Sequence, residues 1–580
     1  MSKDTVSAST LHYDGRMKIL TAAEMQVCDR VTSERFGVPS IALMRNAATT
    51  VAGFVRLHFP LARRVTILCG RGNNGGDGMM TARLLIEAGL DVTTLLLGDP
   101  AALKGDAAQA WVELTAISPT GKNSLRIVKT DEELKDHATA LDTDLIVDAL
   151  VGTGFQPPLR SLPLAALEWM QNGLKASGAG AKILAIDLPS GWDADSTESK
   201  PAGPVFPADA VITFTAPKPA HVFGQLTRSL FDPIVVSSIG SPDEVVVSES
   251  RLSWSGASKA ITEAERPADS NKGMFGHVLV IGGSQGKSGA PAMASLAALR
   301  TGAGLVTSAV APSVLPLVAA VAPELMTKAL AVTAAGEISP DNLSPGALSF
   351  LLHRITVLAL GPGLGTSPEA IEFALGLLSN SNLPAVVDAD GLNALATQPD
   401  LLPKIATGRT LVLTPHPGEM SRLAGVSTAE IQANRLQIAR DFATKNQVTL
   451  VLKGWRTLIA HPDGSVGVNT TGNPGMAKGG SGDLLTGMVA AMLAQHPKDP
   501  QRAVEAAVYL HGLAADITVR SSGIGGDLHT LLATDSLTNL HRAFRYHPLS
   551  VSNHGNSGYV WLQGLPQEVF PVRQSLVGAP

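Results

Sequence analysis

A glycine-rich segment near the C-terminal end of the chain, residues 469–487, combines many backbone amides with one carboxylate. Asp483 follows Gly472, Gly475, Gly479, Gly480 and Gly482, and a helix-like run comes after it. Glycines let backbone N–H groups approach a ligand closely, and a helix N-terminus adds a positive dipole end, so the segment suits an anion such as phosphate. A carboxylate would repel phosphate there unless it had a task. The simplest task is to take a proton from a hydroxyl as a phosphoryl group arrives.

Two other polar side chains in the same half follow predicted strands. His416 stands between two prolines after residues 410–413, and Lys453 follows residues 448–452. Open α/β sheets bind ligands at the carboxyl ends of their strands, so His416 is a candidate site residue and Lys453 a candidate contact for an anionic nucleotide. A structural histidine and a solvated lysine are the alternative explanations. The loop 282–289 resembles a P-loop in composition, but its glycine spacing does not match.

Length and composition predict a multidomain α/β protein. A chain of 580 residues is too long for one ordinary core. It is 45% apolar and only 4% aromatic, with 57 glycines, which suits close helix–strand packing and Gly-rich loops. A net charge of -5 without a basic block argues against a nucleic-acid partner. With only two cysteines, Cys28 and Cys69, a disulfide framework is not expected and a reducing, cytoplasmic location is.

Strand-like runs alternate with helical patterns, and most of these runs end in a polar or Gly-rich loop. In the first half the predicted strands are residues 64–69, 92–97, 144–149, 181–186 and 210–214; in the second half they include 278–281, 356–360, 385–388, 410–413 and 448–452. A helical pattern is expected from Met79 to Ala88. The Ser- and Glu-rich stretch near residues 242–267 lacks a long apolar run and breaks the alternation. This periodicity predicts two α/β domains joined by a linker.

Membrane insertion is not expected. Residues 1–16 are polar and lack an apolar core, which predicts a disordered leader rather than a signal peptide. Residues 301–323 carry no charge, but they contain several prolines and glycines. We therefore predict a buried strand over 305–310 followed by a helix that starts at a proline. The tail after about residue 545 is irregular, and the sequence indicates no role for it.

Four ordered motifs in the second half resemble those of the ADP/ATP-dependent NAD(P)H-hydrate dehydratases, which belong to the ribokinase-like superfamily. They are Gly-Pro-Gly-Leu-Gly at 361–365, Asp-Ala-Asp-Gly-Leu-Asn at 388–393, Thr-Pro-His-Pro-Gly-Glu at 414–419 and the Gly-rich segment 473–483. The resemblance spans about residues 271–545. It implies a ribokinase-like α/β domain that dehydrates hydrated NADH or NADPH at the expense of a nucleotide.

The resemblance also implies roles for individual residues. The hydrate site would be lined by Ala290, Gly363 or Gly365, His416 and Asp483. The adenine nucleotide would be held by Lys453, Gly454, Trp455, Arg456, Thr457 and Gly482. Asp483 would deprotonate the ring hydroxyl as it attacks the terminal phosphoryl group, and the ring nitrogen would then expel phosphate. Mg²⁺ would neutralise the phosphate charge, and ADP is the expected co-substrate, with AMP and phosphate as products.

The first half carries a second resemblance. Gly-Asn-Asn-Gly-Gly-Asp-Gly at 72–78 follows a predicted strand, and its glycines and amides could cradle a pyrophosphate. Together with Asp-Leu-Pro-Ser-Gly at 187–191 and Ala-Pro-Lys-Pro at 216–219, it resembles the NAD(P)H-hydrate epimerases over about residues 17–241. The fold implied is a Rossmann-like αβα sandwich. The expected domains are thus a leader (1–16), an epimerase domain (17–241), a linker (242–270), a dehydratase domain (271–545) and a tail (546–580).

Epimerisation at the ring carbon next to the nitrogen needs little machinery. Loss of the hydroxyl gives an iminium, and water can return to either face, so one carboxylate can serve as acid and then as base. The resemblance points to Asp187, although an isolated aspartate at a strand end ordinarily caps a turn. It places the substrate against Asn73, Asn74, Gly75, Gly76, Asp77, Gly152, Thr153, Gly154, Phe155, Gln156, Pro157, Pro158 and Asp187. It also implies K⁺, bound by oxygens of Asn74, Asp148 and Ser190 as a support for these loops.

Two other functions share part of the pattern. A small-molecule kinase of the same superfamily, acting on a hydroxymethyl pyrimidine or thiazole, would carry the Gly-rich loop and its aspartate but would not need the first domain. The first domain could instead be a non-catalytic binding module, as in related scaffolds of RNA decapping, which tend to lack the aspartate present here as Asp187. We further expect small-molecule substrates, no nucleic-acid or membrane partner, and a homo-oligomer.

Overall fold

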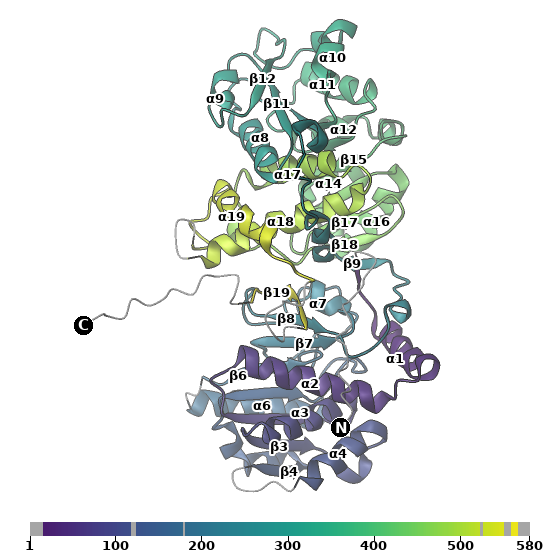
Figure 1. The fold of residues 1–580 in the computed structure, drawn as a ribbon, viewed down its shortest axis with the longest axis vertical. Helices are drawn as coiled ribbons and strands as arrows, with labels where there is room; N and C mark the ends of the chain where they lie inside the picture. Colours follow the sequence, from purple (N-terminus) through teal and green to yellow (C-terminus); the bar gives the residue numbers. More distant parts are fainter. Residues whose placement is uncertain (1–15, 118–122, 178–179, 522–525, 550–557, 567–580) are drawn as a thin grey trace, which may run out of the picture. The chain divides into compact units, whose positions relative to one another are not determined.

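The computed structural model describes residues 16–117, 123–177, 180–521, 526–549 and 558–566, and it divides the chain into two compact units (Figure 1). Unit 1 comprises Met1–Ser250 and Leu549–Pro580, and unit 2 comprises Arg251–Pro548. The boundary falls inside residues 242–270, where a linker is expected. The predicted disordered leader lies outside the described residues, apart from Arg16.

Unit 1 is built on a sheet with the strand order β4-β3-β2-β5-β6-β7-β8-β19. The strands are β2 (Arg64–Cys69), β3 (Asp91–Leu97), β4 (Ser124–Val128), β5 (Leu145–Ala149), β6 (Lys182–Ile186), β7 (Ala210–Phe214), β8 (Ile234–Ser237) and β19 (Tyr559–Gln563). All neighbours pair in parallel except β19, which is antiparallel to β8. Because the connections run outward in opposite directions from β2 and β5, the loops after these two strands flank the switch point, where ligands bind in such sheets.

Helices cover both faces of this sheet. They are α1 (Ala22–Phe36), α2 (Ser40–His58), α3 (Asn73–Glu87), α4 (Gly105–Ala116), α5 (Asp131–Lys135), α6 (Ser161–Ser177) and α7 (Pro219–Phe223). Successive strand residues point to opposite faces: Ile67 lies in the apolar cluster that contains residues of α2, α3 and α4, while Leu68 lies in the cluster that contains Met170 of α6. The result is the αβα sandwich expected for this half.

Helix α3 begins six residues before the predicted start at Met79, so the Asn-Asn-Gly-Gly-Asp segment forms its first turns. Glycine disfavours a helix by about 1 kcal/mol relative to alanine, which is why a loop was expected. Close packing outweighs that preference. A Cβ at Gly75 would lie 1.9 Å from the carbonyl oxygen of Gly70, and a Cβ at Gly78 would lie 2.6 Å from the Cβ of Ala149.

The C-terminal segment supplies an edge strand to unit 1. Strand β19 pairs with β8 (Figure 1). The Tyr559 hydroxyl donates to the carbonyl oxygen of Thr50 at 2.7 Å. The rings of Tyr559 and Phe54 pack edge to face with centroids 5.4 Å apart, and Trp561 is buried beside them. Residues 559–563, to which the sequence indicated no role, are therefore part of the sheet and core of unit 1.

Unit 2 is built on a second sheet, in which the strands follow the order β9-β18-β17-β16-β15-β14-β13-β10-β11-β12. Their bounds are β9 (Leu252–Trp254), β10 (His277–Ile281), β11 (Leu305–Val310), β12 (Met326–Ala329), β13 (Val357–Leu360), β14 (Ala385–Val387), β15 (Leu411–Leu413), β16 (Thr449–Leu452), β17 (Leu458–Ala460) and β18 (Val466–Val468). Only β17 runs antiparallel to its neighbours here. The near-continuous apolar runs of the other strands fit a parallel sheet buried on both faces.

The helices of unit 2 include a group of three that lies next to the Gly-rich segment. The full set is α8 (Gly289–Thr301), α9 (Leu315–Ala319), α10 (Pro345–Leu352), α11 (Pro368–Ser379), α12 (Asp390–Thr397), α13 (Leu402–Ala406), α14 (Pro417–Ala424), α15 (Thr428–Ala433), α16 (Arg435–Asn446), α17 (Ser481–Gln495), α18 (Pro500–Arg520) and α19 (Ala533–Arg545). Helix α17 packs between α8 and α18. It begins inside the Gly-rich segment, at Ser481, and has Asp483 in its first turn.

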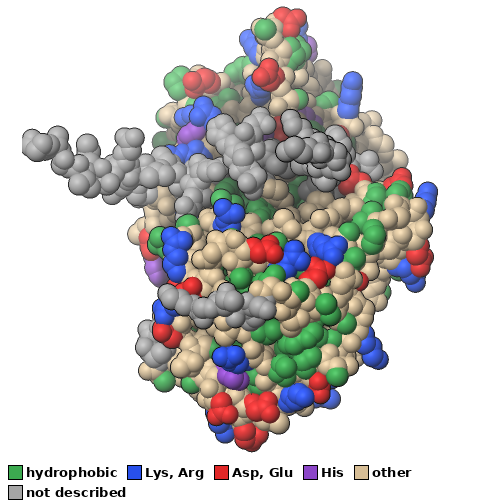
Figure 2. Space-filling model, turned by 60° about the horizontal axis from the view of Figure 1, so that its bottom comes forward, with side chains coloured by type: hydrophobic (Ala, Val, Ile, Leu, Met, Phe, Trp, Pro, Cys, Tyr) green, Lys and Arg blue, Asp and Glu red, His purple; other side chains and the backbone are tan. Residues whose placement is uncertain are grey.

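The uncharged stretch 301–323 forms the buried strand β11 and the short helix α9, which has Pro316 in its first turn. Among the described residues, no helix is both long and apolar enough to cross a membrane. On the face shown in Figure 2, Lys and Arg side chains are interspersed with Asp and Glu among the described residues, in agreement with the small net charge.

Candidate active sites

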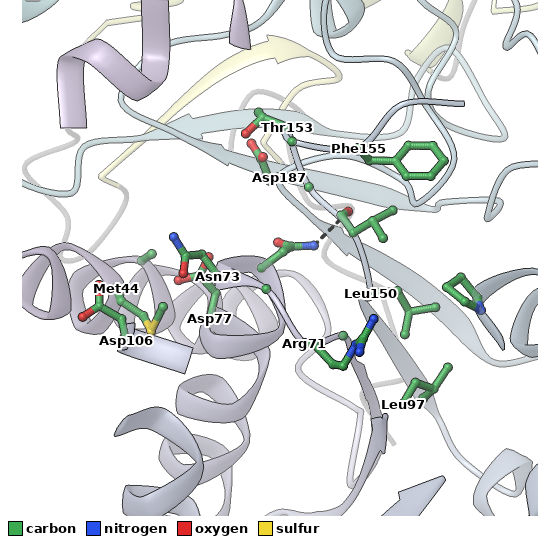
Figure 3. A pocket seen from close by; sticks show the side chains of 18 of the residues that line it. Met44, Arg71, Asn73, Asp77, Leu97, Asp106, Leu150, Thr153, Phe155 and Asp187 are labelled. Carbon is green, nitrogen blue, oxygen red and sulfur yellow. Dashed lines mark hydrogen bonds between the residues drawn. The ribbon is translucent and has the colours of Figure 1, made fainter. Parts of the chain in front are cut away.

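The switch point of unit 1 opens into a cavity of about 1020 Å³ (Figure 3). The predicted substrate residues that line it are Asn73, Asn74, Asp77, Gly152, Thr153, Gly154, Phe155 and Asp187. Its described lining does not include Gly75, Gly76, Gln156, Pro157 or Pro158. Gly75 and Gly76 face the interior: a Cβ at Gly76 would lie 2.5 Å from the Met44 side chain. Gly75 thus brings α3 close to the end of β2, and Gly76 brings it close to α2 and α4.

Asp187 is held by three neighbours at the end of β6. Thr213 Oγ1 and Lys218 Nζ donate to Asp187 Oδ1 at 2.8 and 3.0 Å. The Nδ1 atom of His221 accepts from the Lys218 amide, so its Nε2–H donates to the carbonyl oxygen of Asp187 at 2.6 Å. The backbone of Asp187 has a left-handed φ of 65°, which this network stabilises. The other oxygen, Oδ2, faces Gly152, where a Cβ would lie 3.3 Å away.

The charges around Asp187 keep it ionised. Burial alone would raise its pKa, but the Lys218 ammonium, His221 and the two hydrogen bonds together lower the pKa of Asp187 below its ordinary value. Burial, aided by the Lys218 charge, lowers the pKa of His221 to about 4, so this imidazole is neutral at physiological pH. Asp187 is therefore a fixed carboxylate with one oxygen turned toward the Gly152 loop.

Two further acids border the same cavity. Burial raises the pKa of Asp29, on α1, to about 6, and it raises the pKa of Asp77 well above its ordinary value. Figure 3 shows Asp77 and Asp187 on the cavity wall. The cavity thus combines one carboxylate whose pKa is lowered with two acids whose pKa values are raised. Sequence reasoning missed Asp29, because no local motif surrounds it.

In unit 2, Asp483 lies in the first turn of α17. Burial and the nearby Asp388 raise its pKa to about 6, against the opposing charge of Lys453. This value suits a group that must take up and release a proton near neutral pH. The predicted arrangement of a carboxylate at the start of a helix, directly after glycine-rich backbone, is present.

Asp388 connects the Gly-rich segment to the loop after β16. Lys453 Nζ donates to Asp388 Oδ1 at 3.0 Å, and Thr486 Oγ1 of α17 donates to Oδ2 at 2.8 Å. Lys453 also lies 3.7 Å from Glu419 Oε2. A Cβ at Gly482 would lie 3.3 Å from Lys453 Nζ. Lys453 is therefore not a solvated surface charge, and it stands beside the first turn of α17 as a nucleotide contact would.

Three other predicted residues of unit 2, His416, Gly365 and Ala290, lie in loops or first helical turns that follow strands. His416 caps α14: its Nδ1 accepts from the amides of Gly418 and Glu419, and its side chain is half exposed. Gly365 donates its amide to Asp390 Oδ2 at 2.9 Å, and Ala290 lies in the first turn of α8.

Arg456, which was predicted as a nucleotide contact, points away from solvent. It is buried and donates to the carbonyl oxygen of Thr470 at 2.6 Å. This hydrogen bond joins the loop after β16 to Thr470, while the neighbouring Trp455 is partly exposed. Arg435 of α16 donates to the carbonyl oxygens of Leu452 and Trp455 and so holds this loop at two points. Asp388 and Glu419 were part of quoted motifs, but they were not predicted as site residues.

Both halves of the chain match known families. Residues 278–537 match the family NAD(P)H-hydrate dehydratase, and residues 40–220 match the family YjeF-related protein N-terminus. A curated relative from Moorella thermoacetica, bifunctional NAD(P)H-hydrate repair enzyme Nnr, is 41% identical over 523 residues, which cover 88% of this chain and 95% of the relative. The chain belongs to the family of bifunctional NAD(P)H-hydrate repair enzymes. The relative of the same name from Escherichia coli is 35% identical over 521 residues, with 89% of this chain and 91% of the relative covered.

Among solved structures, the ADP/ATP-dependent NAD(P)H-hydrate dehydratase from Bacillus subtilis, co-crystallized with ATP/Mg²⁺, is 34% identical. The match covers 50% of this chain and 96% of that one, with a TM-score of 0.42. Membership of the bifunctional NAD(P)H-hydrate repair enzymes confirms the predicted order of an epimerase-type Rossmann-like unit and a ribokinase-like dehydratase unit. A kinase with a non-catalytic first domain is not favoured, because relatives of one name cover both halves.

Of the three residues predicted for K⁺, Asp148 and Ser190 are directly hydrogen-bonded, and Asn74 and Ser190 both bond to Val151. Ser190 Oγ donates to Asp148 Oδ1 at 2.6 Å, and the Ser190 amide donates to Oδ2 at 2.7 Å. Asn74 Nδ2 donates to the carbonyl oxygen of Val151, which leaves Asn74 Oδ1 buried without a hydrogen-bond partner. A buried oxygen without a donor suits a cation, so the residues present fit a weakly charged ion such as K⁺.

No group of three or more His, Cys, Asp or Glu side chains among the described residues is placed to hold a metal ion. Mg²⁺ does not require one, because it is usually bound by one or two carboxylates together with substrate phosphates. Asp388 and Glu419 supply two carboxylates around Lys453 in unit 2. Their chemistry fits a Mg²⁺ that enters with the nucleotide.

Proposed function

We propose that unit 1 interconverts the R and S hydrates of NADH and NADPH, and that unit 2 dehydrates the S hydrate with ADP, releasing AMP and phosphate. The observation that carries this proposal is the pair of buried aspartates, Asp187 and Asp483, whose surroundings shift their pKa values in opposite directions. Asp187 borders a cavity at a switch point, and Asp483 starts a helix after glycine-rich backbone. A cytoplasmic location and a homo-oligomeric state remain predictions from the sequence.

In unit 1, the hydroxyl on the ring carbon next to nitrogen must leave as water and return on the other face. The nitrogen lone pair drives departure and forms an iminium, and an acid must protonate the leaving hydroxyl. Asp77 or Asp29, whose pKa values are raised, can supply that proton. Asp187 then takes a proton from the water that adds. K⁺ held by Asn74, Asp148 and Ser190 would stabilise the loops that carry these groups.

In unit 2, Asp483 takes the proton of the ring hydroxyl while the hydroxyl oxygen attacks the terminal phosphorus of the nucleotide. Transfer of the phosphoryl group releases AMP from ADP. The ring nitrogen lone pair then expels the phosphate, and loss of a proton from the neighbouring carbon restores the reduced nicotinamide. Lys453 and the amides near Gly482 would hold the phosphates; a Cβ at Gly482 would lie 3.3 Å from Lys453 Nζ, which supports this role. Mg²⁺, when bound with the nucleotide by Asp388 and Glu419, would supply further charge neutralisation.

The test is a separation of the two activities with two variants. Wild-type protein, Asp187→Asn and Asp483→Asn are each incubated with mixed R and S hydrates, and the return of reduced nicotinamide and the R to S ratio are followed. With ADP, Asp187→Asn should restore only the S fraction at an unchanged rate and leave R to its spontaneous conversion. Without ADP, Asp483→Asn should still equilibrate R and S, while with ADP it should restore almost no NADH. Asp441→Asn, at an exposed position, is the control.

Each alternative outcome decides against part of the proposal. A stable phosphorylated product without recovered NADH would identify unit 2 as a kinase. Unchanged epimerisation in Asp187→Asn would remove the proposed base of unit 1. Full-speed recovery in Asp483→Asn would remove the proposed base of unit 2.

A further inference from the structure

The start of the Gly-rich segment lies on one face of helix α18. Thr471 Oγ1 donates to the carbonyl oxygen of Tyr509 at 2.9 Å. The Gly472 amide donates to Asp516 Oδ2, and Asn473 Nδ2 donates to Asp516 Oδ1, both at 2.8 Å. Positions 509, 512 and 516 are three and four residues apart, which places them on the same side of the helix.

The contact at Gly512 is backbone against backbone. A Cβ at this position would lie 2.4 Å from Thr471 Oγ1, 2.6 Å from the carbonyl carbon of Thr471 and 2.7 Å from the Gly472 nitrogen. There is therefore no space for a side chain between the loop and α18, and the backbone of α18 directly limits how closely the loop approaches it. Asp516 is the side chain on this face whose carboxylate holds the loop at two successive residues.

A chain of hydrogen bonds leads from Asp516 toward the start of α17. Asn473, fixed by Asp516, uses its Oδ1 to accept from the Gly475 amide at 3.0 Å and so caps the short 3-10 helix Pro474–Met476. The carbonyl oxygen of Met476 accepts from Ser481 Oγ at 2.8 Å, and Ser481 is the first residue of α17. Asp483 stands two residues further on.

We propose that Asp516 is a positioning residue of the dehydratase site, which holds the Gly-rich loop and, through it, the first turn of α17 in the geometry that the reaction needs. The proposal rests on the proposed function of unit 2. Asp516 makes its bonds to the loop and takes no part in the chemistry. Donors and acceptors are matched at this contact: the Gly472 amide N–H and the Asn473 NH₂ group each donate to one oxygen of the Asp516 carboxylate.

The test exchanges the two partners. Asp516→Asn leaves one acceptor and places an NH₂ group against a donor, so the loop must move. Asn473→Asp places a second carboxylate against Asp516. The double variant Asn473→Asp/Asp516→Asn restores every bond: the amide at 516 accepts from Gly472 and donates to the carboxylate at 473, which still accepts from the Gly475 amide.

We expect each single variant to lower dehydratase kcat/KM by about 10- to 100-fold, because small misplacements of reacting groups have effects of that size. The double variant should return to within a few fold of wild type. Asp499→Asn on the same helix is the matched control: Asp499 caps α18 through the Arg502 amide, and asparagine is an equally good cap, so activity should not change. The thermal unfolding transition of unit 2, followed by calorimetry, reports in each sample that this unit is folded.

The outcomes separate this proposal from that of the function itself. If the wild-type protein recovers no NADH, the proposed function of unit 2 fails, whatever residue 516 does. If the wild-type protein is active and Asp516→Asn is equally active, the positioning role is wrong. If both single variants are slow and the double variant is no faster, matched bonding at this contact is not what the site requires, and the proposal is overturned.

Discussion

Asp187 and Asp483 are the same residue type, and their surroundings move their pKa values in opposite directions. For Asp187, Lys218 and His221 outweigh burial, and the pKa is lowered. For Asp483, burial and Asp388 outweigh Lys453, and the pKa is raised to about 6. Unit 1 therefore keeps its base form as the solution becomes acidic, whereas the free dehydratase site loses its base form as the pH falls through about 6.

The role of Lys218 can be tested through the pH profile of epimerisation. Lys218→Met keeps the length of the side chain and removes its charge, so burial acts on Asp187 with less opposition and its pKa should rise. The acid limb of kcat/KM, which reports the free enzyme, should move to higher pH. The control is Lys182→Met, which removes a mostly exposed partner of Asp209 and should leave the profile in place. An unshifted limb in Lys218→Met would show that this ammonium does not set the pKa of Asp187.

At the scale of elements, the edge of the unit 1 sheet depends on a strand that lies more than 300 residues further along the chain than its partner β8. Strand β19 buries Trp561 and Tyr559 against α2, and Gln563 Nε2 donates to Thr227 Oγ1 and to the carbonyl oxygen of Asp232. It also covers backbone groups of β8 that would otherwise form an open edge.

Removal of β19 should weaken unit 1 selectively. A chain that ends at Pro548 should lose epimerase activity at a lower temperature than wild type, while the dehydratase keeps its thermal stability. Trp561→Ala should reproduce part of the effect, at about 3 kcal/mol for loss of a buried aromatic side chain. Leu532→Ala, at an exposed position of unit 2, is the control. Equal losses of both activities on heating would contradict an effect confined to unit 1.

At the scale of the whole molecule, each unit has its own sheet, core and proposed ligands. A ligand that binds only the folded state of one unit stabilises that unit, by about 2.7 kcal/mol when its concentration is 100 times its Kd. Because the proposed ion and nucleotide belong to different units, their effects should appear on different unfolding transitions.

Calorimetry of the full chain should therefore resolve two ligand responses. K⁺ in place of a bulky organic cation should raise the transition of unit 1 and leave that of unit 2, whereas MgADP should do the reverse. Asn74→Ala removes the buried oxygen without a donor and should abolish the K⁺ response alone. If K⁺ shifts both transitions, or shifts Asn74→Ala as strongly as wild type, its proposed place in unit 1 is wrong.

Local patterns in the chain were sufficient for much of the architecture. Apolar runs of five or six residues predicted β2, β7 and β11 at the bounds observed, and the Gly-rich motifs predicted which loops lie at ligand-binding edges. The start of α3 was predicted six residues too late, because glycine propensity is local while the packing of Gly75 and Gly78 on the sheet is not. The short strands β4 and β8 were not predicted.

The amino-acid order alone was enough to indicate two α/β domains, both families and both central aspartates, because periodicity and motifs are properties of neighbours along the chain. Asp29 in the epimerase cavity, the Asp388–Lys453 pair, the Asp516 contact and the return of β19 became visible only in three dimensions. Each joins residues that are far apart in sequence, and hydrogen bonds, burial and pKa values depend on distance in space. The opposite tuning of Asp187 and Asp483 belongs to this second group for the same reason.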